Sequence, residues 1–326
     1  MDNNAKLRPL YLAKILYERT DEDHYLTTMQ LAQILEEEYG IPAHRQTIKT
    51  DIELLQQFGM DIQEVKSTQN RYNLISRQFE IAELKLLIDA VQSSKFISKE
   101  RSEQMVSKIV TLAGQHKAEE LKRNASVEGR VKSENRQDLL IVDAINEAIN
   151  ARKKIAFQYF AYNIRKQKKL RHDGERYIFS PYRLIWNGDY YYVLGYSDKY
   201  QAIGSFRVDR ISARPDILSE EAVPVPVDFG VDDFLATTFR MYGSERQEVE
   251  LICDNSVIDA IIDRFGTDVT IYACDMSTFR VIVRVAISHI FFSWIFGFGG
   301  KVKIKGPEDV KEKYSEMLNA AATDLR

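Results

Sequence analysis

One predicted helix presents polar side chains that suit contact with another molecule. Ile48, Ile52 and Leu55 lie four and three residues apart, which predicts a helix over about 44–58 with these residues on its inner face. The outer positions of its first turns hold Arg45, Gln46, Lys49 and Thr50, and Thr47 is a further candidate contact. Arginine can pair with guanine, glutamine with adenine and lysine with phosphate, so this face suits the major groove of DNA. A small helical bundle with a solvated charged face is the alternative.

A short hairpin is predicted after this helix. The stretches DIQEV and RYNLI, separated by the polar turn KSTQN, are typical of two short strands. The hairpin carries Lys66 and Arg71, which suit contact with the DNA backbone or the minor groove. Residues 1–75 hold 8 Lys and Arg against 12 Asp and Glu, an unusual balance for an isolated DNA-binding module. The acidic residues cluster at 21–23 and 36–38, away from the predicted contact face.

A second segment rich in chemically active side chains spans residues 152–214. It holds 14 Lys and Arg against 5 Asp and Glu, although the whole chain has a net charge of only −3. Aromatic residues are interleaved with these cations. Since cations can contact phosphates and aromatic faces can stack on bases, the segment favours an anionic, base-containing ligand. A solvated basic loop beside core aromatics is the alternative.

The stretch FRVDRI places two arginines in a predicted strand. A guanidinium there needs a partner, either a carboxylate of the fold or an anion in a pocket. Asp209 is the expected partner of its neighbours Arg207 and Arg210.

Other chemistries lack a motif. The two cysteines form no CxxC pair, the five histidines have no metal-ligand spacing, and neither a glycine-rich phosphate loop nor a nucleophile motif occurs. We therefore expect no metal, no cofactor and no catalytic residue, and we expect that the protein is not an enzyme. The longest apolar run, 290–298, is too short to cross a bilayer, and the N-terminus lacks the apolar region of a secretory signal. We expect a cytoplasmic protein without membrane contact.

Helical periodicity dominates the first half of the chain. Three helices are expected before the hairpin, and the second begins at Thr27, with Gln30 completing a capping box, and ends at Gly40. Residues 76–130 are helical in pattern, and the polar stretch 117–137 is typical of a linker. A further helix is expected at about 138–151.

Strand-like alternation begins at Lys154. The stretches KIAFQYFAY, YIFSPYRLIW, YYYVLGY and FRVDRIS predict short strands of a small antiparallel barrel or sheet, and RKQKKLRHDGER predicts a basic turn. The proline-containing stretch VPVPVDFG is expected to be a connector. Residues 235–326 then alternate strands with helices in an order typical of a ferredoxin-like α+β domain.

Three stretches, in the same order, resemble bacterial WYL-domain transcriptional regulators. In that family a winged helix-turn-helix precedes a WYL domain and a C-terminal extension of the WCX type. The family's recognition helix resembles HRQTIKTDIELLQQFG, and its WYL core resembles SPYRLIWNGDYYYVLGYSD followed by FRVDRI. The extension is similar to DRFG with SHIFFSWIFGFGGKVKIKGPEDV. The Trp-Tyr-Leu that names the domain is replaced here by Tyr191, Tyr192 and Val193.

The resemblance implies an α+β multidomain protein with four parts. These are a winged helix-turn-helix domain at 1–76, a helical linker at 77–137, a WYL domain at 138–220 that forms a small SH3/Sm-like β-barrel, and a ferredoxin-like extension at 221–326. It also implies a homodimeric regulator that binds double-stranded operator DNA and whose WYL domain senses an effector. We expect that effector to be an anion such as a nucleotide or an oligonucleotide.

The ligand is expected to contact a set of aromatic and basic side chains in the WYL domain. The residues are Tyr159, Lys168, Lys169, Arg171, Tyr182, Tyr192, Arg207 and Arg210. The main alternative function is a non-sequence-specific module for single-stranded nucleic acid. An enzyme that acts on nucleotides is less favoured, because residues 152–214 hold no paired-carboxylate, metal or nucleophile constellation.

Overall fold

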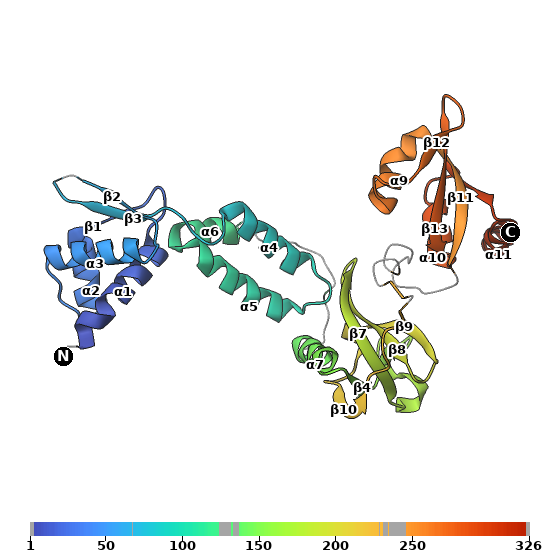
Figure 1. The fold of residues 1–326 in the computed structure, drawn as a ribbon, viewed down its shortest axis with the longest axis horizontal. Coiled ribbons are helices and arrows are strands. Elements are labelled where there is room, and N and C mark those ends of the chain that lie inside the picture. Colours follow the sequence, from blue (N-terminus) through green and yellow to red (C-terminus); the bar gives the residue numbers. More distant parts are fainter. Residues whose placement is uncertain are drawn as a thin grey trace. The chain divides into compact units, whose positions relative to one another are not determined.

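The computed structural model describes residues 3–323 except 67, 124–131, 133–136, 228, 231–233 and 235–245 (Figure 1). The chain divides into two compact units, Met1–Arg136 and Gln137–Arg326. Residues 124–131 and 133–136 of the predicted linker, and residues 231–233 and 235–245, lie outside the described residues.

The first unit begins with three helices and a small sheet. Its elements are α1 (Asn3–Arg19), β1 (Leu26–Thr27), α2 (Thr28–Tyr39), α3 (Arg45–Gln57), β2 (Ile62–Val65) and β3 (Arg71–Leu74). The strands pair antiparallel in the order β1-β3-β2. The capping box of Thr27 and Gln30 is present, and Gly40 ends α2 in the left-handed conformation, so both boundary predictions for α2 are confirmed.

A buried ion pair joins the first and third helices. Ile48, Ile52 and Leu55 pack into the core formed with α1 and α2. On the same buried face, the carboxylate of Asp51 binds the guanidinium of Arg8 from α1, and both side chains are largely hidden from solvent. A buried carboxylate needs such a partner, so the pair fixes the rotation of α3 about its axis.

The rest of the first unit is helical. Its elements are α4 (Ile81–Ser93), α5 (Lys99–Val110), a 3₁₀ turn (Thr111–Ala113) and α6 (Gln115–Arg123). The prediction of a linker from residue 117 was therefore wrong for 117–123. Leu121 alone among the side chains of α6 is buried, so this helix lacks the repeated apolar positions that periodicity detects. Arg77 ties the two halves of the unit together, since its guanidinium donates to the carbonyls of Tyr17 and Leu112.

The second unit begins with α7 (Asp138–Ala151), as predicted, and continues into a five-stranded sheet. The strands are β4 (Lys153–Phe157), β7 (Tyr177–Asn187), β8 (Tyr190–Ser197), β9 (Ala202–Arg207) and β10 (Asp216–Glu221). They pair antiparallel in the order β10-β4-β7-β8-β9. Two further strands, β5 (Phe160–Tyr162) and β6 (Lys168–Leu170), form a separate hairpin.

The predicted β-barrel is not closed. Among the described residues, β9 and β10 are the two edges of the sheet and do not pair with each other, whereas a barrel requires its edges to meet. The chain leaves β9 through a 3₁₀ turn at Val208–Arg210, and one bridge between Tyr159 and Ile211 follows. Arg207 therefore ends the strand, and Arg210 lies in the turn, contrary to the prediction of one strand over FRVDRIS.

The predicted basic turn also differs. The expected strand KIAFQYFAY is interrupted at residues 158–159, so that its second half forms β5. Three residues of the expected basic turn, 168–170, become β6, which pairs with β5 from Phe160 opposite Leu170 to Tyr162 opposite Lys168.

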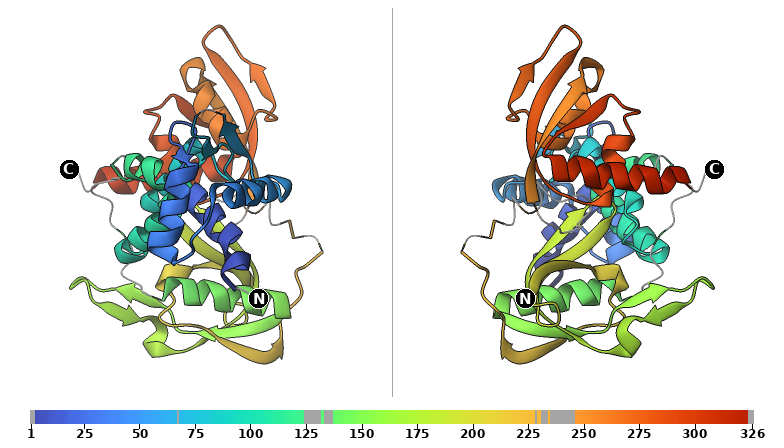
Figure 2. Two further views of the ribbon diagram at one scale, coloured as in Figure 1. Left: turned by 90° about the vertical axis from the view of Figure 1, so that its left-hand side faces the viewer. Right: turned by 90° about the vertical axis from the view of Figure 1, so that its right-hand side faces the viewer.

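The chain ends in a second sheet. Its elements are β11 (Arg246–Asp254), α9 (Ile258–Phe265), β12 (Ile271–Ala273), β13 (Thr278–Ala286), α10 (His289–Phe296), β14 (Val302–Gly306) and α11 (Glu308–Thr323). The strands pair antiparallel in the order β12-β13-β11-β14, the connectivity that defines ferredoxin-like folds. The long α11, drawn in red in Figure 2, packs against β14.

The close approach of β7 and β8 at Gly195 gives a stability prediction. A Cβ at Gly195 would lie 2.2 Å from the carbonyl oxygen of Ser180 and 2.7 Å from the ring of Phe179. We expect Gly195→Ala to lower the free energy of unfolding by about 3 kcal/mol, because both neighbours are buried and cannot retreat. Urea unfolding of the full chain measures the change.

A matched control lies directly across the sheet. Gly204 pairs with Gly195 in β9, and a Cβ there would meet nothing within 4 Å. Gly204→Ala is expected to change stability by less than about 0.5 kcal/mol. Equal effects of the two substitutions would contradict this account of the packing.

Candidate functional site

The predicted DNA-contacting face is exposed on α3. The buried residues Ile48 and Asp51 hold the inner side of the helix, so that Arg45 and Gln46 face solvent at its N-terminal end. In the described part of the chain, neither of these two side chains has a hydrogen-bond or ion-pair partner. Arg45 and Gln46 are therefore available to an external partner, and the N-terminal end of a helix also favours anions.

The other predicted DNA contacts are less free. Thr50 donates its hydroxyl to the carbonyl of Gln46 at 3.1 Å, and Thr47 is half-buried. The ammonium of Lys49 lies 3.9 Å from the carboxylate of Glu53, a weak exposed pair that gives way at little cost.

The hairpin residues belong to the same unit as α3. Lys66 follows β2 and is exposed. Arg71 begins β3 and lies over the ring of Tyr25, with its guanidinium carbon 4.3 Å from the ring centroid. Arg71 therefore combines a packing role within the fold with a charge at its surface.

A buried carboxylate organises the arginines of the second unit. Asp209 is 8% exposed, and its carboxylate lies 2.8 Å from the guanidinium of Arg207 and 3.9 Å from that of Arg210. The prediction that Asp209 partners its neighbouring arginines is confirmed. The charge of these two arginines is thus partly neutralised within the fold.

Arg207 is held on all sides by its own chain. Its guanidinium carbon lies 3.3 Å from the centroid of the Tyr190 ring, and its backbone N–H donates to the hydroxyl of Tyr159 at 3.2 Å. Burial acts to lower the pKa of Arg207, but the hydrogen bond and the charge of Asp209 outweigh it, so the pKa is raised. Burial also raises the pKa of the Tyr159 phenol, to about 12.

Tyr190 was missing from the predicted site. It lies two residues before Tyr192 in β8, and residues two apart in a strand share a face. Because Tyr192 pairs with Arg207 in the sheet, this alternation also directs Tyr190 toward Arg207. The alternation of side chains along the strand could have pointed to Tyr190. Using it, however, required knowing that β8 pairs with β9.

The interleaved aromatic rings pack against cations of the same chain. The guanidinium carbon of Arg210 lies 4.8 Å from the ring centroid of Tyr162, and the ammonium of Lys168 lies 4.9 Å from that of Phe160. These cation–π contacts cover faces that a base would otherwise stack on. The aromatic and basic composition therefore reflects contacts within the domain, and it does not by itself define a base-binding platform.

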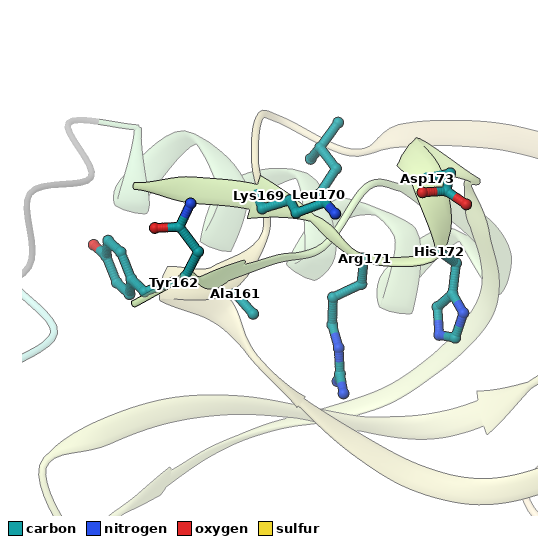
Figure 3. Close-up of a pocket in the computed structure, with 8 residues that line it drawn as sticks. Ala161, Tyr162, Lys169, Leu170, Arg171, His172 and Asp173 are labelled. Carbon is teal, nitrogen blue, oxygen red and sulfur yellow. The ribbon is translucent and has the colours of Figure 1, made fainter. Parts of the chain in front are cut away.

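A hollow of about 390 Å³ lies along the β5–β6 hairpin (Figure 3). Its lining residues are Ala161, Tyr162, Asn163, Lys169, Leu170, Arg171, His172 and Asp173. Figure 3 shows Arg171 and His172 extending to the same side of the chain. Within the described ranges, the side chains of Lys169 and Arg171 have no acidic partner. Beside the carboxylate of Asp173, the hollow therefore holds two cations without an ion-pair partner and the ring of Tyr162, a set that suits a phosphate-bearing anion.

Two of the predicted ligand residues do not line the hollow. The hydroxyl of Tyr182 donates to the carbonyl of Pro224, in the connector that follows β10, at 3.1 Å. Tyr192 packs against a small apolar cluster formed by Ile185, Leu194 and Phe234. The remaining residues form two neighbouring groups, one around Asp209 and one around the hollow, and the ring of Tyr162 belongs to both.

Comparison with known proteins identifies the class of the central domain. Residues 141–214 match the family model of the WYL domain, so the chain contains a WYL domain. The proteasome accessory factor B/C (PafBC) of Arthrobacter aurescens is a similar solved structure, with 16% sequence identity and a TM-score of 0.28. The alignment covers 98% of this chain and 46% of that one, so this chain spans about half the length of PafBC. No curated protein matches the chain.

The described residues hold neither a metal-binding cluster nor a membrane-spanning helix. No group of three or more His, Cys, Asp and Glu side chains in this part of the chain could hold a metal ion. No helix in it has the length and apolar character needed to cross a membrane.

The buried phenol of Tyr159 predicts a loss of stability at alkaline pH. A native pKa of about 12, against 10 for the free side chain, means that the native state keeps a proton that the unfolded state gives up. The contribution of the Tyr159 phenol to the free energy of unfolding is therefore complete below pH 10. It is lost as the pH rises toward 12, by about 2–3 kcal/mol in all. Urea unfolding between pH 9 and pH 12 should show a flatter profile for Tyr159→Phe than for the wild type.

The control is Tyr162→Phe, which removes a hydroxyl from a ring that is 44% exposed. Its pH profile should follow that of the wild type. Parallel profiles for the wild type and Tyr159→Phe would show that the Tyr159 phenol is not protected by burial.

Proposed function

We propose that the protein is a transcriptional regulator that binds DNA through its first unit and senses an anionic ligand through its WYL domain. The observation that carries the proposal is the exposed pair Arg45 and Gln46 at the N-terminal end of α3, in a chain that also contains a WYL domain. In this proposal α2 and α3 form a helix-turn-helix, and the β2–β3 hairpin, with Lys66 and Arg71, is its wing.

The geometry of the first unit supports this assignment. The Arg8–Asp51 ion pair and the buried apolar face of α3 hold the helix so that its first turns face outward. Arg45 and Gln46 would contact base edges, while Lys49 and Lys66 would contact phosphates. Thr47 and Thr50 complete the surface that enters the major groove.

The ligand in this proposal is a phosphate-bearing anion, such as a nucleotide or an oligonucleotide, held in the hollow beside Lys169 and Arg171. Tyr162 forms one wall, and Lys168 and Arg210 lie against the same hairpin. Tyr159 and Arg207 position this group from the sheet side. Tyr182 and Tyr192 lie on the sheet away from the hollow and would sense the ligand only through the movement of β8 and the connector.

Regulation requires two arrangements of the protein with different affinities for the ligand. A homodimer would place two copies of α3 on half-sites about one helical turn of DNA apart. A ligand that favours one arrangement would then change the spacing of the two helices and hence the affinity for the operator. The ferredoxin-like sheet is the C-terminal extension of this regulator.

Binding, and not catalysis, is the proposed role of the WYL domain. Several carboxylates of the domain are engaged by cations of the same chain, because Asp198 pairs with Lys154 and Glu175 pairs with Lys199. Asp209 is shared between two arginines. These pairs support a binding domain with a fixed charge pattern.

Removing the two cations of α3 should weaken operator binding. Arg45→Ala combined with Lys49→Ala is expected to cost about 1–3 kcal/mol, roughly a 5- to 150-fold loss of affinity, because a guanine contact and a phosphate contact disappear together. A gel shift with the operator measures this loss. The control is Arg101→Ala with Lys108→Ala, two exposed cations of α5 in the same unit. An unchanged affinity in the α3 variant would refute the assignment of α3.

The anion site predicts that the purified protein carries its ligand. We expect excess absorbance at 260 nm from released nucleotide-like material, and we expect Lys169→Gln with Arg171→Gln to lower it at least tenfold, since charge-assisted phosphate contacts are lost. Absorbance and mass spectrometry of the released material measure this. Arg214→Gln is the control, because Arg214 is exposed, lies outside the hollow and pairs with Glu147. Equal material on both variants would rule out this site.

A further inference from the structure

The β5–β6 hairpin ends in a loop, residues 163–167, whose shape is fixed by one side chain. The carboxamide oxygen of Asn163 accepts hydrogen bonds from the backbone N–H groups of Arg165, at 2.9 Å, and Gln167, at 3.0 Å. The backbone N–H of Lys166 also donates to the carbonyl of Asn163 at 2.9 Å. The loop is therefore preformed, and a partner that binds it does not have to order it first.

The tip of this loop presents an apolar side chain between cations. Ile164 is 100% exposed, and Arg165 and Lys166 follow it directly. In the part of the chain that the structure describes, the side chains of Arg165 and Lys166 make no hydrogen bond and no ion pair. A single exposed isoleucine is common on protein surfaces. Ile164, however, lies at the tip of a rigid loop whose cations have no ion-pair partner, and this position suits insertion into a polyanion.

The remaining residues of the hairpin add further positive charge to that of the tip. Lys168, Lys169 and Arg171 continue the basic run along β6 and beyond it, and among the described residues none of them has an acidic partner. Residues 164–167, which we call the tip, do not line the hollow, whereas Asn163, whose side chain fixes the loop, does. The two cations of the tip, Arg165 and Lys166, thus lie outside the proposed ligand site.

Duplex nucleic acid fits this tip better than a single strand does. Proteins that bind single strands stack bases on free aromatic faces. Residues 163–167 contain no aromatic ring, and the nearest rings, Phe160 and Tyr162, already lie under Lys168 and Arg210. A duplex instead offers phosphates to the cations and a base step in its minor groove to an apolar wedge.

We propose that the tip of the β5–β6 hairpin, residues 164–167, binds the backbone and minor groove of duplex DNA without regard to sequence. It is a second DNA contact in addition to α3. The proposal extends the proposed function, because it assigns part of the affinity for DNA to the domain that senses the ligand. Its chemistry, however, depends only on residues of the hairpin.

The test uses the full chain with a 30-base-pair duplex of random sequence and a single strand of the same length. Fluorescence anisotropy gives the affinity for each between 50 and 200 mM KCl. The variant is Arg165→Gln with Lys166→Asn, because Lys166 has a φ of 61° and asparagine tolerates that left-handed conformation. The control is Lys311→Gln with Lys313→Gln, which removes the same charge from α11.

The proposal predicts a smaller salt dependence for the tip variant. Loss of two phosphate contacts lowers the slope of log affinity against log salt by about 1.8, so its deficit relative to the wild type on the duplex shrinks about tenfold between 50 and 200 mM. Ile164→Ser is expected to weaken duplex binding at every salt concentration without changing the slope. The control should keep the slope of the wild type, and the melting temperature of every variant should stay unchanged.

Two results would overturn the proposal. The first is a tip variant whose slope on the duplex equals that of the wild type. The second is a loss on the single strand as large as that on the duplex. Neither result bears on α3, because the random duplex contains no operator. Conversely, if Arg45→Ala with Lys49→Ala left operator affinity unchanged, the assignment of α3 would fail while the result for the tip stood.

Discussion

Asp209 is a buried carboxylate that accepts contacts from two guanidinium groups, and the arrangement of the WYL domain depends on it. Arg207 reaches it from the end of β9 and covers Tyr190, while Arg210 reaches it from the following 3₁₀ turn and covers Tyr162. One carboxylate thereby connects the sheet to the β5–β6 hairpin. Without it, two half-buried cations would be left without compensation, a more costly state than the loss of an exposed pair.

This internal pairing decides where the charge of the domain faces solvent. Cations of the sheet such as Lys154 and Arg207 pair with carboxylates, whereas in the described part of the chain those of the β5–β6 hairpin do not. The excess positive charge is thus concentrated on a hairpin that carries a hollow and a rigid tip. In the first unit, too, an internal ion pair determines which side chains face solvent. The Arg8–Asp51 pair is buried, whereas Arg45 and Gln46 on the same helix as Asp51 are exposed.

Local signals in the sequence predicted elements with clear boundaries. The capping box at Thr27, the glycine at Gly40 and the bounds of α7 needed only short-range patterns. The pairing of strands that are distant in the sequence could not be predicted from such patterns. The break between β4 and β5 lies within continuous alternation, and the contact of Tyr190 with Arg207 depends on the register of β8 against β9. Composition likewise indicated cations and aromatics together, but not that they pack on one another.

The central claim is that the first unit recognises a specific DNA sequence. Repeated selection from a library of random duplexes by the full chain tests it most directly, since no operator has to be known beforehand. The account predicts enrichment of one motif with two related half-sites about one helical turn apart. Recovery of duplexes without any enriched motif would contradict it, because the hairpin alone would then explain the binding.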